Sequence, residues 1–174
     1  VMICLSTLGQ APAVSFSVAV MAGLAPDGGL YVPDHLPVMP AEWWQSLRDR
    51  SYPDVAVALM TALVSDDIPP PALERIVRDA LDFPMPIRTL DGRLSVLELF
   101  HGPTFAFKDV GARMLARLMS HLSTPETGPL TVLVATSGDT GSAVAQAFHG
   151  VPGTRVVVLY PEGQVSAVQE AQFT

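Results

Sequence analysis

The feature that most constrains the fold is a series of alternating patterns late in the chain. A β-branched apolar run, Thr131–Ala135, leads into a loop with the sequence TSGDTG (136–141). An alanine-rich segment then ends at Gly150, and a second apolar run, Arg155–Tyr160, follows. Strand, loop, helix and strand in this order predict a βαβ unit with parallel strands and a right-handed crossover. The sequence therefore predicts an α/β fold.

The TSGDTG loop follows the first of these strands and precedes the helix. Free backbone N–H groups at the start of a helix, beyond the carboxyl end of a strand, form a natural anion-binding site. The residues match neither G-x-G-x-x-G nor the lysine-bearing P-loop, so a dinucleotide or nucleoside triphosphate is not indicated. Two interpretations stay open: the loop binds a ligand, or Asp139 or Thr140 only caps the helix.

A second segment, HGPTFAFKD (101–109), contains Lys108, the only lysine among the ten Lys and Arg residues. Apolar residues recur at helical spacing after it, so Lys108 is predicted in the first turn of a helix. The helix dipole and burial among Phe105 and Phe107 would both disfavour the ammonium form. Because arginine cannot form a Schiff base, Lys108 alone could anchor a carbonyl substrate or pyridoxal phosphate. The stripe Asp109, Arg113 and Arg117 is predicted to be a separate solvated or ion-paired face.

Three motifs in order resemble the threonine synthase family of fold-type-II pyridoxal phosphate enzymes. They are GPTFAFKD (102–109), ATSGDTG (135–141) and YPEGQVSAVQEAQ (160–172). The earlier segments STLG (6–9) and GLAPDGGLYVP (23–33) are also similar to that family. The resemblance thus extends over nearly the whole chain and is least specific between about residues 34 and 90.

The resemblance implies a role for each matching residue. Lys108 matches the lysine that binds pyridoxal 5'-phosphate as a Schiff base and moves protons on the substrate carbons. Ser137, Gly138, Asp139 and Thr140 match the loop that binds the substrate α-carboxylate, and Asp139 also matches a position near the hydroxyl of the cofactor ring. The implied reaction converts O-phospho-L-homoserine and water to L-threonine and phosphate. The alternatives are a related phospholyase that releases a keto acid, or a truncated non-catalytic scaffold.

Composition restricts the partners. The net charge of −7 and the lack of a basic cluster argue against nucleic acid. No apolar run approaches the roughly 18 residues of a membrane span. A single cysteine, Cys4, fits a reducing cytoplasm, and the four scattered histidines predict no metal site. Only 16% of the residues are charged, against roughly 25% in typical soluble domains. Exposed apolar surface is therefore expected to meet a missing C-terminal portion of the chain or to cause self-association.

The chain is expected to divide near residue 85. Residues 1–85 are predicted to form a mostly helical N-terminal domain after an initial strand, with Asp54 as the N-cap of one helix. Residues 86–174 are expected to be the first part of a cofactor-binding catalytic α/β domain whose remainder is absent. This part opens with a hairpin around Asp91-Gly92. The expected helices of the first part are 15–24, 42–49, 54–64 and 72–81.

Overall fold

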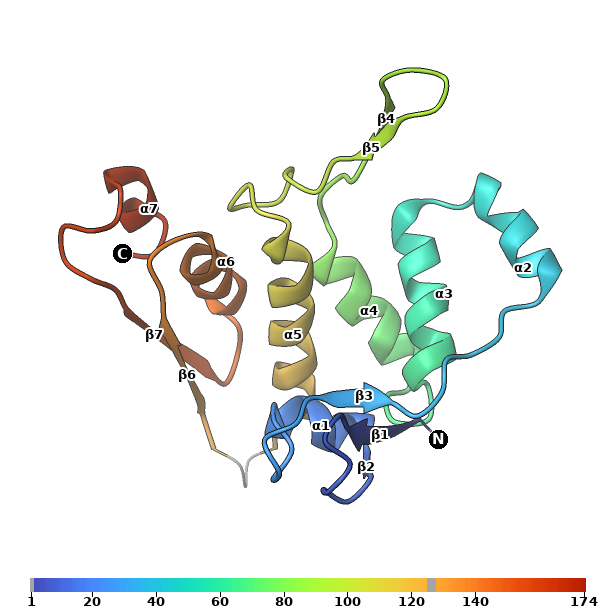
Figure 1. The fold of residues 1–174 in the computed structure, drawn as a ribbon, viewed down its shortest axis with the longest axis horizontal. Helices are drawn as coiled ribbons and strands as arrows, with labels where there is room; N and C mark the ends of the chain where they lie inside the picture. The colour runs from blue at the N-terminus through green and yellow to red at the C-terminus, as the bar shows by residue number, and fades with distance from the viewer. Residues whose placement is uncertain (1, 125–127) are drawn as a thin grey trace. The chain divides into compact units, whose positions relative to one another are not determined.

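The computed structural model describes residues 2–124 and 128–174. These residues form two compact units, Val1–Asp79 and Ala80–Thr174 (Figure 1). The boundary between the units falls just before Ala80, the last residue of helix α4. The domain boundary near residue 85 stays a sequence-based prediction.

The first unit begins with a small antiparallel sheet of strand order β2-β1-β3. Its strands are β1 (Ile3–Ser6), β2 (Val14–Ser15) and β3 (Tyr31–Pro33). Helix α1 (Phe16–Ala22) starts where Ser15 accepts a hydrogen bond from the Val18 N–H, and Ala19 packs against Met2 and Cys4. The sequence predicted β1 and α1 but not β3. Three residues are too short for a period-2 pattern, and the strand that β3 pairs with lies far back in the sequence.

Three further helices complete most of this unit. They are α2 (Ala41–Ser46), which continues as the 3-10 helix η1 (Leu47–Asp49), α3 (Tyr52–Val64) and α4 (Pro70–Ala80). The expected helices are present, but the predicted N-cap at Asp54 is wrong. Ser51 caps α3 instead, accepting a hydrogen bond from the Asp54 N–H at 3.3 Å. The reason is that Pro53 fits within the first helical turn, where its missing N–H needs no partner.

The second unit opens with the predicted hairpin. Strands β4 (Ile87–Thr89) and β5 (Ser95–Leu97) pair antiparallel. In the turn, Asp91 Oδ1 accepts hydrogen bonds from the backbone N–H groups of Arg93 and Leu94, at 2.8 and 3.0 Å. A loop then leads to helix α5 (Lys108–Leu122).

The βαβ unit predicted from the sequence is present and confirms the α/β fold class. Strands β6 (Leu130–Ala135) and β7 (Thr154–Leu159) pair in parallel, with helix α6 (Asp139–Phe148) between them in the chain. Gly150 follows α6 with φ of +69°, a conformation that suits glycine at a helix end. Beyond β7 lies the short helix α7 (Ala167–Ala171), which was not predicted.

The two faces of the β6–β7 pair differ. Val132 and Val156 pack against the Ala147 and Phe148 side chains of α6. On the opposite face, Leu133 is 64% exposed and Leu159 53% exposed. Parallel strands are usually covered on both faces, so this apolar face is an unusual surface.

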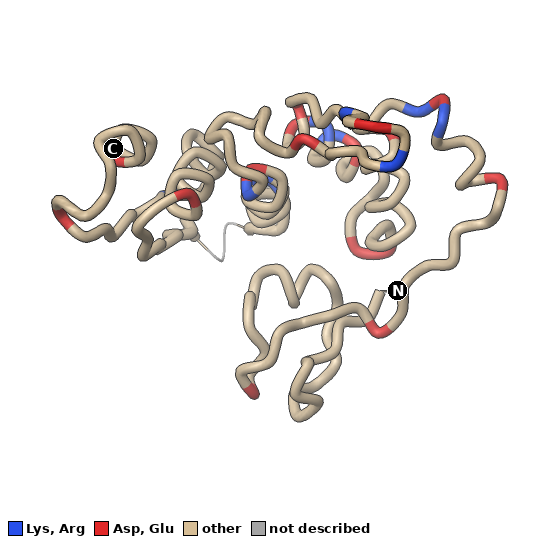
Figure 2. The backbone as a smooth tube through the Cα atoms, turned by 45° about the horizontal axis from the view of Figure 1, so that its top comes forward, with Lys and Arg blue, Asp and Glu red and all other residues tan. Residues whose placement is uncertain are grey.

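Charged positions are sparse along the backbone, most of which carries neither sign (Figure 2). Among the described residues, no helix is long and apolar enough to cross a membrane.

Candidate functional site

Helices α5 and α6 lie side by side and run in the same direction. The Arg117 guanidinium donates to the carbonyl of Ala147 at 2.8 Å, and the Ser120 hydroxyl donates to the carbonyl of Pro152 at 3.0 Å. The later residue of α5 thus contacts the later residue of the other segment, which is the order expected for parallel helices. Ala116 of α5 also packs with Ala147 and Phe148 of α6.

The two helices also begin at the same level. Arg117 lies nine residues after Lys108, the first residue of α5, and Ala147 lies eight residues after Asp139, the first residue of α6. At 1.5 Å per residue, each contact is therefore about 13 Å from its helix start. Packed helices are about 8–10 Å apart. The first turns of α5 and α6, and with them Lys108 and the TSGDTG loop, consequently lie at one end of the second unit; the two helices are labelled in Figure 1.

The loop before Lys108 is held by a buried carboxylate. Asp109 has no exposed surface, and its two oxygens accept hydrogen bonds from the Thr104 N–H at 2.9 Å and the Thr104 hydroxyl at 2.6 Å. Between these residues, Phe105 has φ of +59°, which is uncommon for a residue other than glycine. Lys108 itself is half-buried, and its Nζ lies 4.6 Å from the centre of the Phe107 ring.

The expected burial of Lys108 among two aromatic rings is wrong. Phe105 is 74% exposed and Phe107 is 62% exposed. Phe105, whose backbone is left-handed, therefore leaves most of its ring in solvent instead of burying the amine.

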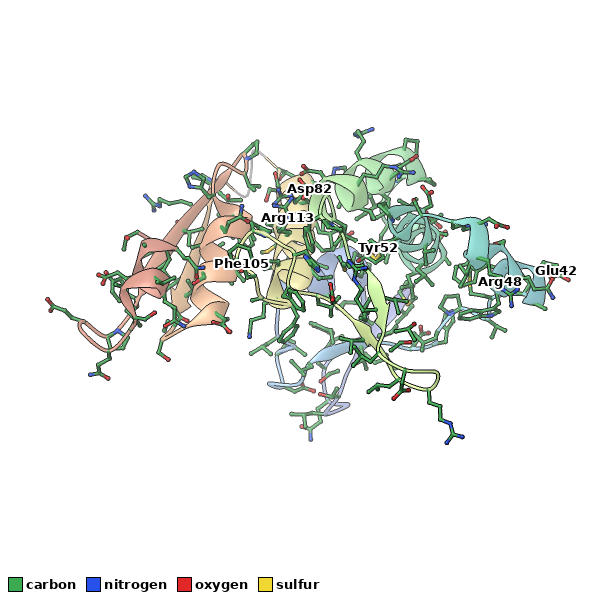
Figure 3. All side chains as sticks on the ribbon, turned by 90° about the horizontal axis from the view of Figure 1, so that it is seen from above. Glu42, Arg48, Tyr52, Asp82, Phe105 and Arg113 are labelled. Atoms are coloured by element: carbon green, nitrogen blue, oxygen red, sulfur yellow. The ribbon has the colours of Figure 1, made fainter. Side chains whose placement is uncertain are left out.

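The stripe Asp109, Arg113 and Arg117 is predicted to be a solvated or ion-paired face; the solvated alternative is wrong, and the ion-paired alternative is met at Arg113. Asp109 is buried, and Arg113 is only 6% exposed. Arg113 Nε donates to the carbonyl of Ala80 at 2.8 Å, and its terminal nitrogen pairs with Asp82 at 2.7 Å (Figure 3). Asp109 and Arg113 therefore pack inside the second unit, where hydrogen bonds to residues outside α5 satisfy their polar groups.

The start of α6 is organised by Thr136. Its hydroxyl oxygen accepts hydrogen bonds from the N–H groups of Gly138 and Gly141, at 3.2 and 3.0 Å. A Cβ at Gly141 would collide with the Thr136 side chain, so glycine is required for this approach. Asp139 and Thr140 do not cap the helix, and the capping interpretation of these two residues is wrong.

The four loop residues of the predicted carboxylate site are accessible. Ser137, Asp139 and Thr140 are exposed, and Gly138 is half-buried. Among the described residues, none accepts a hydrogen bond from the backbone N–H of Asp139 or Thr140. Two donors at a helix start are thus available to an anion.

The segment after β7 lies near this loop. A Cβ built on Gly138 would be 3.2 Å from Nε2 of Gln169 in α7. The Tyr160 hydroxyl donates to Glu170 Oε1 at 2.8 Å, and this hydrogen bond raises the pKa of Tyr160. The third motif found in the sequence therefore belongs to the same end of the second unit.

Sequence reasoning missed Thr104, the role of Asp109, and Thr136. A signal for the first pair exists in the spacing GPTxxxxD, where a hydroxyl precedes a carboxylate by five residues. Thr136 likewise precedes Gly141 by five residues. Within the described part of the chain, no cluster of three metal-ligating side chains occurs.

Comparison with known proteins gives a consistent result. A sequence model of the threonine synthase N terminus matches residues 4–81. Threonine synthase of Escherichia coli K12 is 42% identical over 160 residues, which cover 92% of this chain and 37% of that protein. Threonine synthase of Schizosaccharomyces pombe is 41% identical over 184 residues, covering 98% of this chain and 36% of that protein. Over nearly its whole length, the chain is therefore similar to the N-terminal part of threonine synthases.

The solved structures agree with this similarity. The crystal structure of threonine synthase from Brucella melitensis, with pyridoxal phosphate bound, superposes with a TM-score of 0.95 at 45% sequence identity. The match covers 100% of this chain and 39% of that one. The fold class is thus that of the fold-type-II pyridoxal phosphate enzymes, and the chain spans a little over a third of the length of these threonine synthases.

Proposed function

We propose that this protein is a threonine synthase, a pyridoxal phosphate-dependent lyase that converts O-phospho-L-homoserine and water into L-threonine and phosphate. The carrying observation is that Lys108 and the unpaired N–H groups of Asp139 and Thr140 begin two helices that pack side by side. A primary amine can bind an aldehyde cofactor, and a helix start can bind a carboxylate. Similarity to threonine synthases supports the reaction.

The residues around Lys108 fit an aldehyde cofactor. None of the described carboxylates forms an ion pair with the Lys108 amine. The amine instead lies 4.6 Å from the centre of the Phe107 ring. Gly111, one helical turn further, faces open space, since a Cβ there would meet nothing within 4 Å. A planar ring could thus approach the first turn of α5 without displacing a side chain at this position.

Each residue is proposed to act in a distinct way. Lys108 Nζ holds the cofactor as a Schiff base and moves protons at the substrate carbons. The N–H groups of Asp139 and Thr140, with the Ser137 hydroxyl, bind the α-carboxylate, and Gly138 lets the loop backbone approach it. Asp139 also lies beside the cofactor. Pyridoxal phosphate, when bound, withdraws electrons from the reacting carbon.

The protein is proposed to act in the cytoplasm, as part of threonine biosynthesis. The single, buried Cys4 supports this location, because secreted domains commonly depend on disulfides. We propose the small-molecule substrate as its partner. The exposed face of β6 and β7, where Leu133 and Leu159 lie, is proposed to contact the C-terminal portion of the longer chain or a second copy of this one. Cell fractionation with a specific antibody tests the location, and recovery in the membrane or secreted fraction would contradict it.

Borohydride reduction of the full-length protein with pyridoxal phosphate tests the assignment of Lys108. The pyridoxyl label should map to the peptide that contains Lys108, and both Lys108→Ala and Lys108→Arg should lose the label and the release of phosphate and threonine. As a matched control, Arg93→Lys in the Lys108→Ala background places a lysine on the exposed hairpin and should restore neither. A wild-type label found elsewhere would refute the proposal, and a keto acid in place of threonine would assign a phospholyase.

A further inference from the structure

The hydrogen bonds between Thr104 and Asp109 close a short segment that contains Lys108. Asp109 is completely buried and Thr104 is 8% exposed. Both carboxylate oxygens are used, one by the Thr104 N–H and one by its hydroxyl. Hydrogen bonds to an ionised acceptor in a buried setting are among the strongest that proteins form.

Two further observations show that this segment is tightly determined. Phe105 keeps a left-handed backbone although its ring is 74% exposed and gains little from packing. Such a conformation persists only where the surroundings impose it. In addition, Gly102 could not carry a side chain, because a Cβ there would collide with the Asp109 carboxylate.

The carboxylate next to the lysine is turned away from the amine. Successive residues on a helix point about 100° apart, so Asp109 faces the loop while Lys108 leaves the helix in another direction. Asp109 therefore fixes the backbone of its neighbour without forming an ion pair with the Lys108 amine. Arg113, one turn further, ties the same helix to Ala80 and Asp82.

We infer that Thr104 and Asp109 are positioning residues, which hold the first turn of α5 so that the Lys108 amine meets the cofactor aldehyde. The inference rests on the proposed function. Neither residue is required to touch the cofactor. Their effect reaches the reaction through the backbone between residues 104 and 109, so loss of the Thr104 hydroxyl should weaken cofactor retention while leaving Lys108 chemically intact.

The test compares two Thr→Val changes in the full-length protein. Thr104→Val removes one hydrogen bond to Asp109. Thr154, the first residue of β7, has a hydroxyl that donates to the carbonyls of Phe148 and Val151, and Thr154→Val removes it. We expect Thr104→Val to weaken the retention of pyridoxal phosphate at Lys108 by about 10-fold or more. Thr154→Val should change it by less than about threefold, and Thr104→Ser should restore it because the hydroxyl returns.

Retention is read from a cofactor titration followed by borohydride fixation and quantification of the Lys108 peptide. Thermal unfolding is measured beside it. If Thr104→Val does not fold, Asp109→Asn is used, since it keeps the shape and removes the charge. Equal labelling of wild type and Thr104→Val, equal losses in Thr104→Val and Thr154→Val, or no rescue by Thr104→Ser would overturn the inference. Failure of wild-type Lys108 to take the label would instead refute the proposed function, and the inference with it.

Discussion

Replacing Gly141 by alanine should loosen the first turn of α6. The new Cβ would lie 2.8 Å from Cβ and 2.9 Å from Oγ1 of Thr136, and closer still to its methyl group. Carbon atoms pack best at about 3.5–4.0 Å, so one of the two residues must move. If Thr136 turns away, the hydrogen bonds from Gly138 and Gly141 are lost.

The expected magnitude follows from these contacts. Two hydrogen bonds contribute about 2 kcal/mol together, and tolerating the overlap instead costs about 1–3 kcal/mol. Against this, alanine stabilises a helix by up to about 1 kcal/mol relative to glycine. The net loss should be about 1–2 kcal/mol, which corresponds to about 5- to 30-fold faster local opening.

Hydrogen exchange at the amides of α6 in the full-length protein, without cofactor, measures this opening. Gly111→Ala is the matched control, because a Cβ at Gly111 in α5 meets nothing within 4 Å. It should leave exchange in α6 unchanged and slow exchange in α5, since alanine favours the helix. Exchange in Gly141→Ala that is as slow as in the wild type would refute the argument that Thr136 and Gly141 are mutually dependent.

Three other predictions follow from the same contacts. Ser137→Ala combined with Thr140→Val should raise the apparent KM for O-phospho-L-homoserine far more than it weakens cofactor binding, and equal losses in substrate kinetics and cofactor titration would favour a structural role. Hydrogen bonds from Ser51 and Arg78 lower the pKa of Asp54, so its ionised form stabilises the fold above its unfolded pKa of about 3.9, and this stabilisation is lost as the pH falls through the lower folded value. Thermal unfolding of wild type and Asp54→Asn should therefore differ most above about pH 5 and converge in stronger acid, whereas a constant difference would contradict the assignment. A polypeptide of residues 1–174 alone should self-associate in sedimentation and release no phosphate, because the face with Leu133 and Leu159 is apolar and exposed, and a monomer that makes threonine would show this to be wrong.

Much of the fold could be predicted from local patterns. The hairpin around Asp91 and the βαβ unit were predicted because turn chemistry and apolar spacing act over a few residues. The short strand β3 could not be, because its conformation depends on pairing with β1, far away in the sequence. A helix after the TSGDTG motif was predicted, although it begins already at Asp139, and the threonine that organises its start was not predicted.

The sequence by itself determined the chemistry available at the site: one lysine, placed at a helix start by the spacing of the apolar residues that follow it. Only the tertiary structure decided the environment of its charged neighbours. Asp109 and Arg113 carry a spacing that suits either a solvated face or a buried one. Their partners, Thr104, Ala80 and Asp82, lie outside α5, and burial became favourable only where the folded chain brought these groups within hydrogen-bonding distance.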